Sequence, residues 1–354
     1  MNSSATKKPL LMVGNFLSET HGVRGVCEEL ASRLGPLGWP IITTSNRSNR
    51  AARLFDMVRT AWINRDEYAA AQVDVYSGSA FIWAEAVCWT LRQVGKPYVL
   101  TLHGGNLPAF SRRWPGRVRR LLESAEVVTA PSEYLYESLR SFREDIKIQP
   151  NPLELKSYQF RLRERPRPLL VWLRAFHKMY NPTLAIEVLA ALKPDFPEIK
   201  LTMIGPDKGD GSLQSVIDRA EQLQVTKCLN LVGAVPKADV PKHLNVGDIF
   251  LNTTNVDNTP VSVLEAMACG LCVVSTSVGG MPYLLENESN ALLVPVDDAS
   301  AMAESVRKLL SDADLSTRIS WRARRKAEQC DWNNVLRLWD ELFTNVISRS
   351  KQQS

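Results

Sequence analysis

The chain has 354 residues, more than a single hydrophobic core usually supports, so two domains are the starting expectation. Apolar residues make up 45% and charged residues 23%, proportions that exclude a disordered, collagen-like or coiled-coil protein. Lys and Arg number 43 against 38 Asp and Glu, and the net charge of +5 is too small to indicate a nucleic-acid partner.

The amino-terminal segment predicts no targeting signal. Its apolar run, Leu10–Val13, is shorter than the ~7–15 apolar residues of a signal peptide. No stretch approaches the ~18–20 apolar residues of a transmembrane helix. The six cysteines are spaced too unevenly for a disulfide framework. We therefore expect a cytoplasmic protein with reduced thiols, and a peripheral contact with the inner face of the cell membrane stays open.

The first half alternates short apolar runs, which predict strands, with amphipathic stretches, which predict helices. The expected strands are Leu10–Gly14, Pro40–Thr44, Val73–Tyr76, Tyr98–Leu102, Val127–Ala130 and Ile146–Gln149. The expected helices include Gly25–Leu34, Ala80–Val94, Arg117–Ser124 and Ser132–Phe142. This alternation indicates a parallel sheet covered on both faces.

A basic segment, Arg112–Arg120, carries five arginines around Trp114. Residues 1–165 have a net charge of +7, and the remainder has −2, so the small total hides an asymmetric molecule. The segment is either a solvated surface or a contact with anionic lipid headgroups, to which each basic residue contributes ~1 kcal/mol. Nucleic acid is not expected, because aromatic residues are sparse among the arginines.

The segment Arg161–Pro168 breaks the periodicity, and its two prolines forbid a helix. We therefore expect an amino-terminal domain over 1–165, a second domain over 166–330, and a terminal helix over 331–354. Strands are expected in the second half at Leu169–Leu173, Lys200–Ile204, Leu229–Val232, Ile249–Asn252, Cys272–Ser275 and Ala291–Val294. Helices are expected at Pro182–Leu192, Leu213–Leu223, Val261–Ala268 and Ala299–Leu310. The fold class is α/β, with two doubly wound domains.

Two cations follow the first strand of this second series. Arg174 and Lys178 lie just beyond Leu173, where ligands bind in open α/β sheets. An arginine fork and a lysine point charge can together neutralise a diphosphate. Taken alone, they could equally be solvated loop cations.

The most informative stretch runs from Asn255 to Gly280, after the strand that ends at Asn252. Asn258 or Thr259 is expected to cap a helix that has Pro260 at its first position. A helix that opens at the carboxyl end of a strand is a natural phosphate site. The acids Asp257 and Glu265 lie near it, and carboxylates there suit paired sugar hydroxyls.

The run Glu265 to Gly270, followed by a buried strand and Gly279-Gly280, resembles the GT4 family of glycosyltransferases. The resemblance covers residues 9 to about 345 and implies a GT-B fold of two Rossmann-like domains facing across a cleft. It also implies retaining, metal-independent transfer. The family motif has two glutamates separated by seven residues; Glu265 matches the second, and Asp257 stands in place of the first.

The resemblance assigns roles to residues of both halves. It implies that Arg174 and Lys178 bind the donor diphosphate, with the backbone of Asn258, Thr259, Pro260 and Val261 beside it. Glu265 would bind the nucleotide ribose, and Asp257 would contact the donor sugar. His103, which taken alone would more often be structural, would also reach the sugar. Gly104 and Gly22 would line the substrate site, with His21 in place of a family glycine, and Tyr283 replaces a family acid.

Two further motifs are read as structural. Cys269 and Cys272 form a CxxC that closes a helix, whereas a redox pair normally opens one. Asp312 and Asp314 form a DxD between late helices, away from any strand end, so no metal is expected there. The terminal helix is expected to cross back onto the first domain with a buried stripe of Trp332, Leu336, Trp339 and Phe343.

Together these features predict a hexosyltransferase-type glycosyltransferase that moves a sugar from a nucleotide-diphosphate sugar to a glycan or lipid-linked acceptor. Cell-surface polysaccharide or glycolipid synthesis is the expected setting, with no separate cofactor. The alternative is a catalytically impaired protein that binds nucleotide sugars. A nucleotide-sugar epimerase would need acid and base groups that the sequence does not identify. The nucleotide, the sugar, the acceptor and the oligomeric state stay open.

Overall fold

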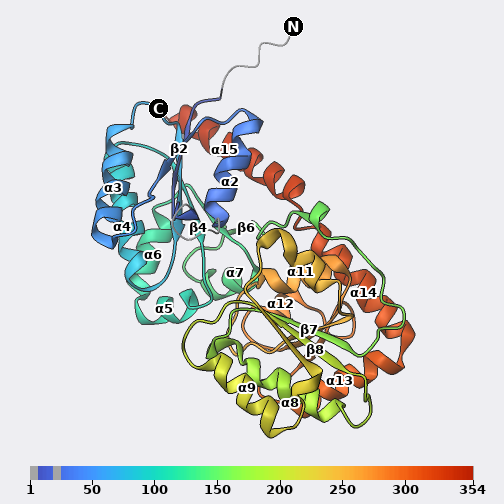
Figure 1. Ribbon diagram of the computed structural model, residues 1–354. Coiled ribbons are helices and arrows are strands. Elements are labelled where there is room, and N and C mark those ends of the chain that lie inside the picture. The colour runs from blue at the N-terminus through green and yellow to red at the C-terminus, as the bar shows by residue number, and fades with distance from the viewer. Residues whose placement is uncertain (1–6, 19–24, 354) are drawn as a thin grey trace. The chain divides into compact units, whose positions relative to one another are not determined.

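The computed structural model describes residues 7–18 and 25–353, and the chain divides into two compact units (Figure 1). Unit 1 consists of Met1–Pro152 together with Asn333–Ser354, and unit 2 of Leu153–Trp332. Each unit contains a six-stranded sheet with helices in its connections. The expected α/β architecture with two doubly wound halves is therefore confirmed.

The sheet of unit 1 is parallel throughout and has the order β2-β1-β3-β4-β5-β6. All four side chains of β1 are buried, which explains why its sequence is a continuous apolar run rather than an alternating one. The strands are β1 (Leu10–Val13), β2 (Ile41–Thr44), β3 (Ala70–Val75), β4 (Tyr98–Leu102), β5 (Val127–Ala130) and β6 (Lys147–Ile148).

The last helix of the chain belongs to unit 1. The Trp39 indole donates to Asp340 of this helix at 2.7 Å, and the Trp39 ring packs edge-on against Phe343. The predicted stripe is buried at Trp332, Trp339 and Phe343. The helices of unit 1 are α2 (Val26–Leu34), α3 (Arg50–Ile63), α4 (Phe81–Gln93), α5 (Leu107–Arg113), α6 (Pro115–Glu123), α7 (Glu133–Leu139) and α15 (Trp332–Gln353), with 3-10 turns η1 (Gly35–Leu37) and η2 (Gly78–Ala80).

The sheet of unit 2 is also parallel and has the order β12-β11-β10-β7-β8-β9. The chain moves outward in one direction from β7 and in the other from β10, so the strand order reverses between these two neighbours. The crevice beyond such a reversal is where open α/β sheets bind ligands. The strands are β7 (Leu169–Leu173), β8 (Lys200–Ile204), β9 (Leu229–Gly233), β10 (Ile249–Asn252), β11 (Cys272–Thr276) and β12 (Leu292–Val294).

The connections of unit 2 are mostly helical. The helices are α8 (Pro182–Leu192), α9 (Ser212–Gln222), α10 (Val240–Leu244), α11 (Val261–Cys269), α12 (Met281–Leu284), α13 (Ala299–Ser311) and α14 (Ala313–Glu328). The 3-10 turns are η3 (Leu155–Ser157), η4 (Lys178–Tyr180), η5 (Thr226–Cys228) and η6 (Lys237–Asp239).

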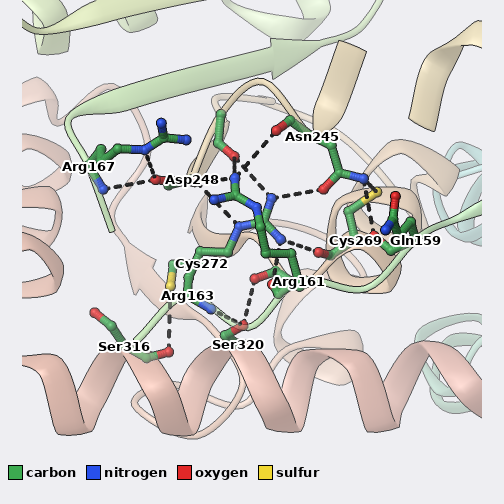
Figure 2. Close-up of polar contacts among 12 residues, drawn as sticks. Gln159, Arg161, Arg163, Arg167, Asn245, Asp248, Cys269, Cys272, Ser316 and Ser320 are labelled. Carbon is green, nitrogen blue, oxygen red and sulfur yellow. Dashed lines mark hydrogen bonds and ion pairs between the residues drawn. The ribbon is translucent and has the colours of Figure 1, made fainter. Parts of the chain in front are cut away.

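The segment Arg161–Pro168, expected to divide the domains, lies inside unit 2. Figure 2 shows its polar contacts. Arg163 is only 2% exposed, and its guanidinium donates to the carbonyl oxygens of Cys269 and Gly247. The buried carboxylate of Asp248 faces three arginines of this segment, Arg161, Arg163 and Arg167. The structure places the boundary at Leu153 instead of residue 166, because these ionic contacts hold the extended segment against unit 2.

The two motifs read as structural have structural roles. The thiols of Cys269 and Cys272 are buried, and burial raises the pKa of each to about 12. Both therefore stay protonated at neutral pH, unlike a redox thiol. Asp312 caps α14 by accepting a hydrogen bond from the backbone N–H of Leu315 at 2.9 Å.

Candidate active site

The strand reversal of unit 2 brings two predicted residues together. Arg174 follows β7 directly, and Asp257 lies in the loop after β10, the strand paired with β7. The Arg174 guanidinium forms an ion pair with the Asp257 carboxylate. It also stacks on the Tyr180 ring, with 4.3 Å between the guanidinium carbon and the ring centroid.

The Arg174 guanidinium is largely removed from water. Burial lowers the pKa of Arg174, against the opposing attraction of Tyr180 and Glu265. Its Nε atom is buried and has no hydrogen-bond partner among the described residues. Since a buried donor without a partner is costly, the side chain is suited to an additional acceptor such as a phosphate oxygen.

Three glycines allow the backbone to close around this pair. A Cβ atom at Gly205, after β8, would lie 1.7 Å from the Arg174 carbonyl oxygen. At Gly279 it would lie 2.1 Å from the Asp257 carbonyl oxygen, and at Gly280 it would lie 1.9 Å from that of Asn258. The glycine pair of the sequence motif therefore packs directly beneath the Asp257 loop, and no larger residue fits there without moving it.

Lys178 begins the 3-10 turn η4 and is exposed. Its backbone N–H donates to Asp210 at 2.9 Å, and its ammonium forms no ion pair with a described residue. The next residue ties this turn to the Asp257 loop, because the Met179 carbonyl accepts from the Asn255 N–H at 2.9 Å. Arg174, Lys178 and Asp257 therefore lie on backbone segments that are joined to one another.

Helix α11 starts at Val261, as the expected range Val261–Ala268 has it, but Pro260 is not its first helical residue. Pro260 has an extended backbone and serves as the N-cap, so Val261 is the first helical residue. The expected N-cap at Asn258 or Thr259 is wrong, since Pro260 occupies that position, and its side chain makes no cap hydrogen bond. The first N–H groups of a helix have no partner within it, and they carry its positive dipole end. Ser262, 6% exposed, adds a buried hydroxyl without a hydrogen-bond partner in the described chain.

Glu265 projects from α11 and is 4% exposed. Its Oε1 atom accepts a hydrogen bond from the Tyr158 hydroxyl at 2.7 Å and pairs with the Lys237 ammonium. Its Oε2 atom makes no hydrogen bond to any residue in the described part of the chain, which leaves that oxygen available to accept from a ligand. Tyr158 and Lys237 were not predicted, because nothing in their own neighbourhoods marks them and their partner lies far away in the sequence.

In unit 1, His103 follows β4, and its Nε2 atom lies 2.9 Å from Oδ1 of Asp74 on β3. The imidazole stacks on the Tyr76 ring, with 4.8 Å between centroids. Gly104 follows in a left-handed conformation, with φ of +85°. Sequence reasoning missed Asp74, although a carboxylate inside an otherwise buried strand is unusual and could have indicated it. These residues belong to unit 1, and the Arg174 cluster belongs to unit 2.

The strand reversal of unit 1, between β1 and β3, has a small cavity of about 20 Å³. Gly14, Asn15, Asp74 and Tyr76 contribute to its lining, and it has room for about one water molecule. The predicted glycine Gly22 and its neighbour His21 lie outside the described residues.

The basic segment covers the end of α5 and most of α6, and all of its arginines except the half-buried Arg117 are exposed. No cluster of three or more potential metal ligands occurs among residues 7–18 and 25–353. In the same part of the chain, no helix combines the length and the apolar character needed to span a bilayer.

Two family models match adjoining parts of the chain. The model of glycosyltransferase family 4 matches residues 18–157, and the model of glycosyl transferases group 1 matches residues 157–326. The chain belongs to the GT4-type glycosyltransferases. Its Glu265 motif and the loops that carry Arg174 and Asp257 lie within the second match.

One curated relative of this GT4-type chain is WcaL of Escherichia coli K12, a glycosyltransferase named for colanic acid biosynthesis. The two are 30% identical over 227 residues, which cover 62% of this chain and 51% of WcaL. The chain spans about half the length of the first curated relatives it matches.

Solved structures show the same fold. Sucrose-phosphate synthase from Thermosynechococcus elongatus matches with a TM-score of 0.78 and 17% identity, over 97% of this chain and all of that one. Anabaena HepE, solved in complex with UDP-glucose, matches with a TM-score of 0.71 and 15% identity, over 96% of this chain and all of HepE. The expected GT-B fold is therefore confirmed.

Proposed function

We propose that the protein is a retaining glycosyltransferase that uses a nucleotide-diphosphate sugar. The observation that carries the proposal is the arrangement at the strand reversal of unit 2. There a largely buried arginine and an exposed lysine lie in the segment after β7, and helix α11, which follows the loop after β10, contributes its N-terminus and a buried glutamate. This set fits a diphosphate bound next to a ribose.

Arg174, Lys178 and the N–H groups at Val261 and Ser262 would stabilise the charge that accumulates on the departing nucleotide diphosphate. Arg174 would exchange its Asp257 partner for a phosphate oxygen and would use its unpaired Nε as a second donor. These groups supply the positive charge without a metal ion, which supports metal-independent transfer.

The carboxylates would bind sugar hydroxyls. Glu265 would accept from the ribose through its free Oε2, while Asp257, released from Arg174, would orient the transferred sugar. Retention in this family is generally explained by attack from the front face, with the leaving phosphate helping to deprotonate the acceptor. No protein nucleophile is needed, and we assign none.

The proposed classes of donor and acceptor are supported by similar proteins. HepE is a GT-B neighbour solved with UDP-glucose, which supports a nucleotide-sugar donor. WcaL is named for colanic acid biosynthesis, which supports a glycan or lipid-linked acceptor of a hexosyltransferase. We also propose that the protein is cytoplasmic and that Arg112–Arg120 contacts the anionic inner face of the membrane.

A second candidate is a nucleotide-sugar-binding protein that has lost activity. Asp257 is one methylene shorter than the family glutamate and is paired with Arg174, which favours this candidate. The two functions differ in turnover, whereas both predict binding.

The proposal is tested with a panel of UDP-, GDP- and ADP-sugars, with binding followed by thermal shift and turnover by release of the nucleoside diphosphate. We expect one nucleotide to raise the melting temperature and one of its sugars to be hydrolysed or transferred, with EDTA leaving the rate unchanged. NMR of the transfer product should show the anomeric configuration of the donor. Binding without turnover would favour the inactive protein, and an inverted product would contradict retention.

Tyr158 is expected to act as a positioning residue for Glu265. Tyr158→Phe removes one hydrogen bond to a buried carboxylate, so the KM for the donor should rise about three- to tenfold. The kcat should change little, because the ribose is remote from the bond that breaks. Tyr98→Phe is the matched control, since this buried tyrosine of unit 1 loses a hydrogen bond to Ser124 of 2.8 Å. A fall in kcat with KM unchanged would contradict the assigned role.

A further inference from the structure

One face of unit 1 carries an exposed apolar groove between α3 and α4. Its volume is about 360 Å³. Phe55, Trp62 and Ile63 of α3 are 70%, 48% and 52% exposed, and Trp89 of α4 is 56% exposed. Contiguous exposed apolar surface of this kind marks an interaction site more often than scattered single residues do.

The apolar character of α3 extends around the helix. Met57 and Ala61 are buried against the sheet, whereas Phe55 and Trp62 project outward two turns apart. A helix that is apolar on two faces can bury only one of them within its own unit. The outer face of α3 is thus left for a partner.

The groove contains few polar groups. The Thr90 hydroxyl is used within its own helix, where it donates to the Ala86 carbonyl at 3.0 Å. Arg59 is exposed and forms no ion pair with a residue that the structure describes. The groove therefore presents an apolar floor with one free cation.

The helices beside the groove are strongly basic. In sequence, α3, α4, α5 and α6 contain nine arginines and three acidic residues. Arg117 of α6 pairs with Glu85 of α4, and the rings of Phe81 and Phe110 join α4 to α5 at 4.8 Å. The apolar groove and the Arg112–Arg120 segment therefore belong to adjoining helices of one unit (Figure 1).

We propose that the α3–α4 groove inserts into the interfacial region of an anionic lipid bilayer. Tryptophan side chains favour this region because the ring is apolar and the indole N–H is polar, while arginines attract anionic headgroups. Charge complementarity favours lipid over a second copy of the chain, since pairing two copies through this groove would bring two sets of predominantly basic helices together. The inference adds an apolar contact to the membrane part of the proposed function and does not depend on sugar transfer.

The test is flotation of the full chain with vesicles of phosphatidylcholine alone or mixed with phosphatidylglycerol, without donor or acceptor. Trp62→Ala/Trp89→Ala should lower partitioning onto the mixed vesicles about tenfold relative to wild type. Trp321→Ala is the matched control, because this tryptophan of unit 2 is 50% exposed, and it should float like wild type. Wild-type tryptophan fluorescence should be quenched by lipids brominated in the upper acyl chain, and the double variant should lose most of this quenching and keep only the part due to Trp114.

Equal flotation of wild type and the double variant would overturn the proposal, as would the absence of quenching in the wild type. Light scattering without vesicles tests for a second copy in the groove: a dimer that the double variant abolishes would also overturn it. Unchanged melting temperatures show that the variants are folded, and the quenching of the wild type tests the proposal even if a variant is not. Because no sugar is present, the result is independent of whether the protein proves to be a transferase.

Discussion

Lys178→Ala is expected to lower kcat about a hundredfold to a thousandfold, the range for removing one group that stabilises transition-state charge. The ammonium is exposed and forms no ion pair with a described residue, so the fold loses nothing with it. Its partner would be the leaving diphosphate, whose charge increases as the glycosidic bond breaks. Steady-state kinetics with the donor found in the panel measure the effect.

Lys227→Ala provides the matched control. Lys227 is also exposed in unit 2, but it precedes β9. It therefore lies at the amino ends of the strands, whereas the proposed site lies at their carboxyl ends. This variant should keep the wild-type kcat, and both variants should keep the wild-type melting temperature. If Lys178→Ala turned over at a near wild-type rate, the assignment of Lys178 to the diphosphate would be refuted.

Asp248→Asn is expected to destabilise unit 2 by about 3–5 kcal/mol, the usual cost of leaving a buried charge without its partner. Both Asp248 and Arg163 have side chains that are nearly inaccessible, at 2% and 1% exposed. Without the carboxylate, the Arg163 guanidinium stays buried among carbonyl groups and an amide, as Figure 2 shows. Native-state hydrogen exchange of amides in α11 measures the change, because Arg163 binds the last carbonyl of this helix.

The effect of Asp248→Asn should depend on pH in a defined direction. Burial raises the pKa of Asp248, but hydrogen bonds and charge from Arg167 and Arg161 outweigh it, so the net pKa is lowered. Because the pKa of Asp248 is lower in the folded state, its carboxylate stabilises the fold at any pH above the unfolded-state pKa of about 3.9. This stabilisation is lost as the pH falls through the folded-state pKa. The difference in the free energy of unfolding between wild type and Asp248→Asn should therefore be largest at neutral pH and shrink below about pH 4.

Asp195→Asn is the control for this experiment. Asp195 pairs with Arg307 on the surface, where the two side chains are 50% and 35% exposed. Exposed pairs of this kind contribute about 0–1 kcal/mol, so this variant should be nearly as stable as wild type. Equal stabilities of the Asp248 and Asp195 variants would contradict the view that the buried pair holds the Arg161–Pro168 segment in place.

Most strands of the two sheets could be predicted, because a strand that is buried on both faces appears in the sequence as a short, continuous apolar run. Tyr98–Leu102, Leu169–Leu173 and Ile249–Asn252 were predicted with their observed bounds. Helix α3 was not named among the expected helices. Its outer residues Phe55 and Trp62 are apolar and exposed, which blurs the amphipathic pattern that marks a surface helix.

The extended Arg161–Pro168 segment shows the limit of local reasoning most directly. The prolines and charged residues of this segment are typical of a solvated linker, yet Arg163 is among the most buried large side chains that the structure describes. Its partners, Asp248 and the last carbonyl of α11, are some 80 to 110 residues away in the sequence. No local pattern can indicate such a pairing.

The sequence by itself determined the fold class, the two series of strands and the residues that mark the family, because each depends on short-range periodicity or on a contiguous motif. Only the tertiary structure decided how these residues meet. It paired Arg174 with Asp257, placed Tyr158 on Glu265 and showed that Gly279 and Gly280 support the Asp257 loop. These are contacts between segments separated by many residues, and the order of strands in the sheet, rather than any local sequence, brings them together.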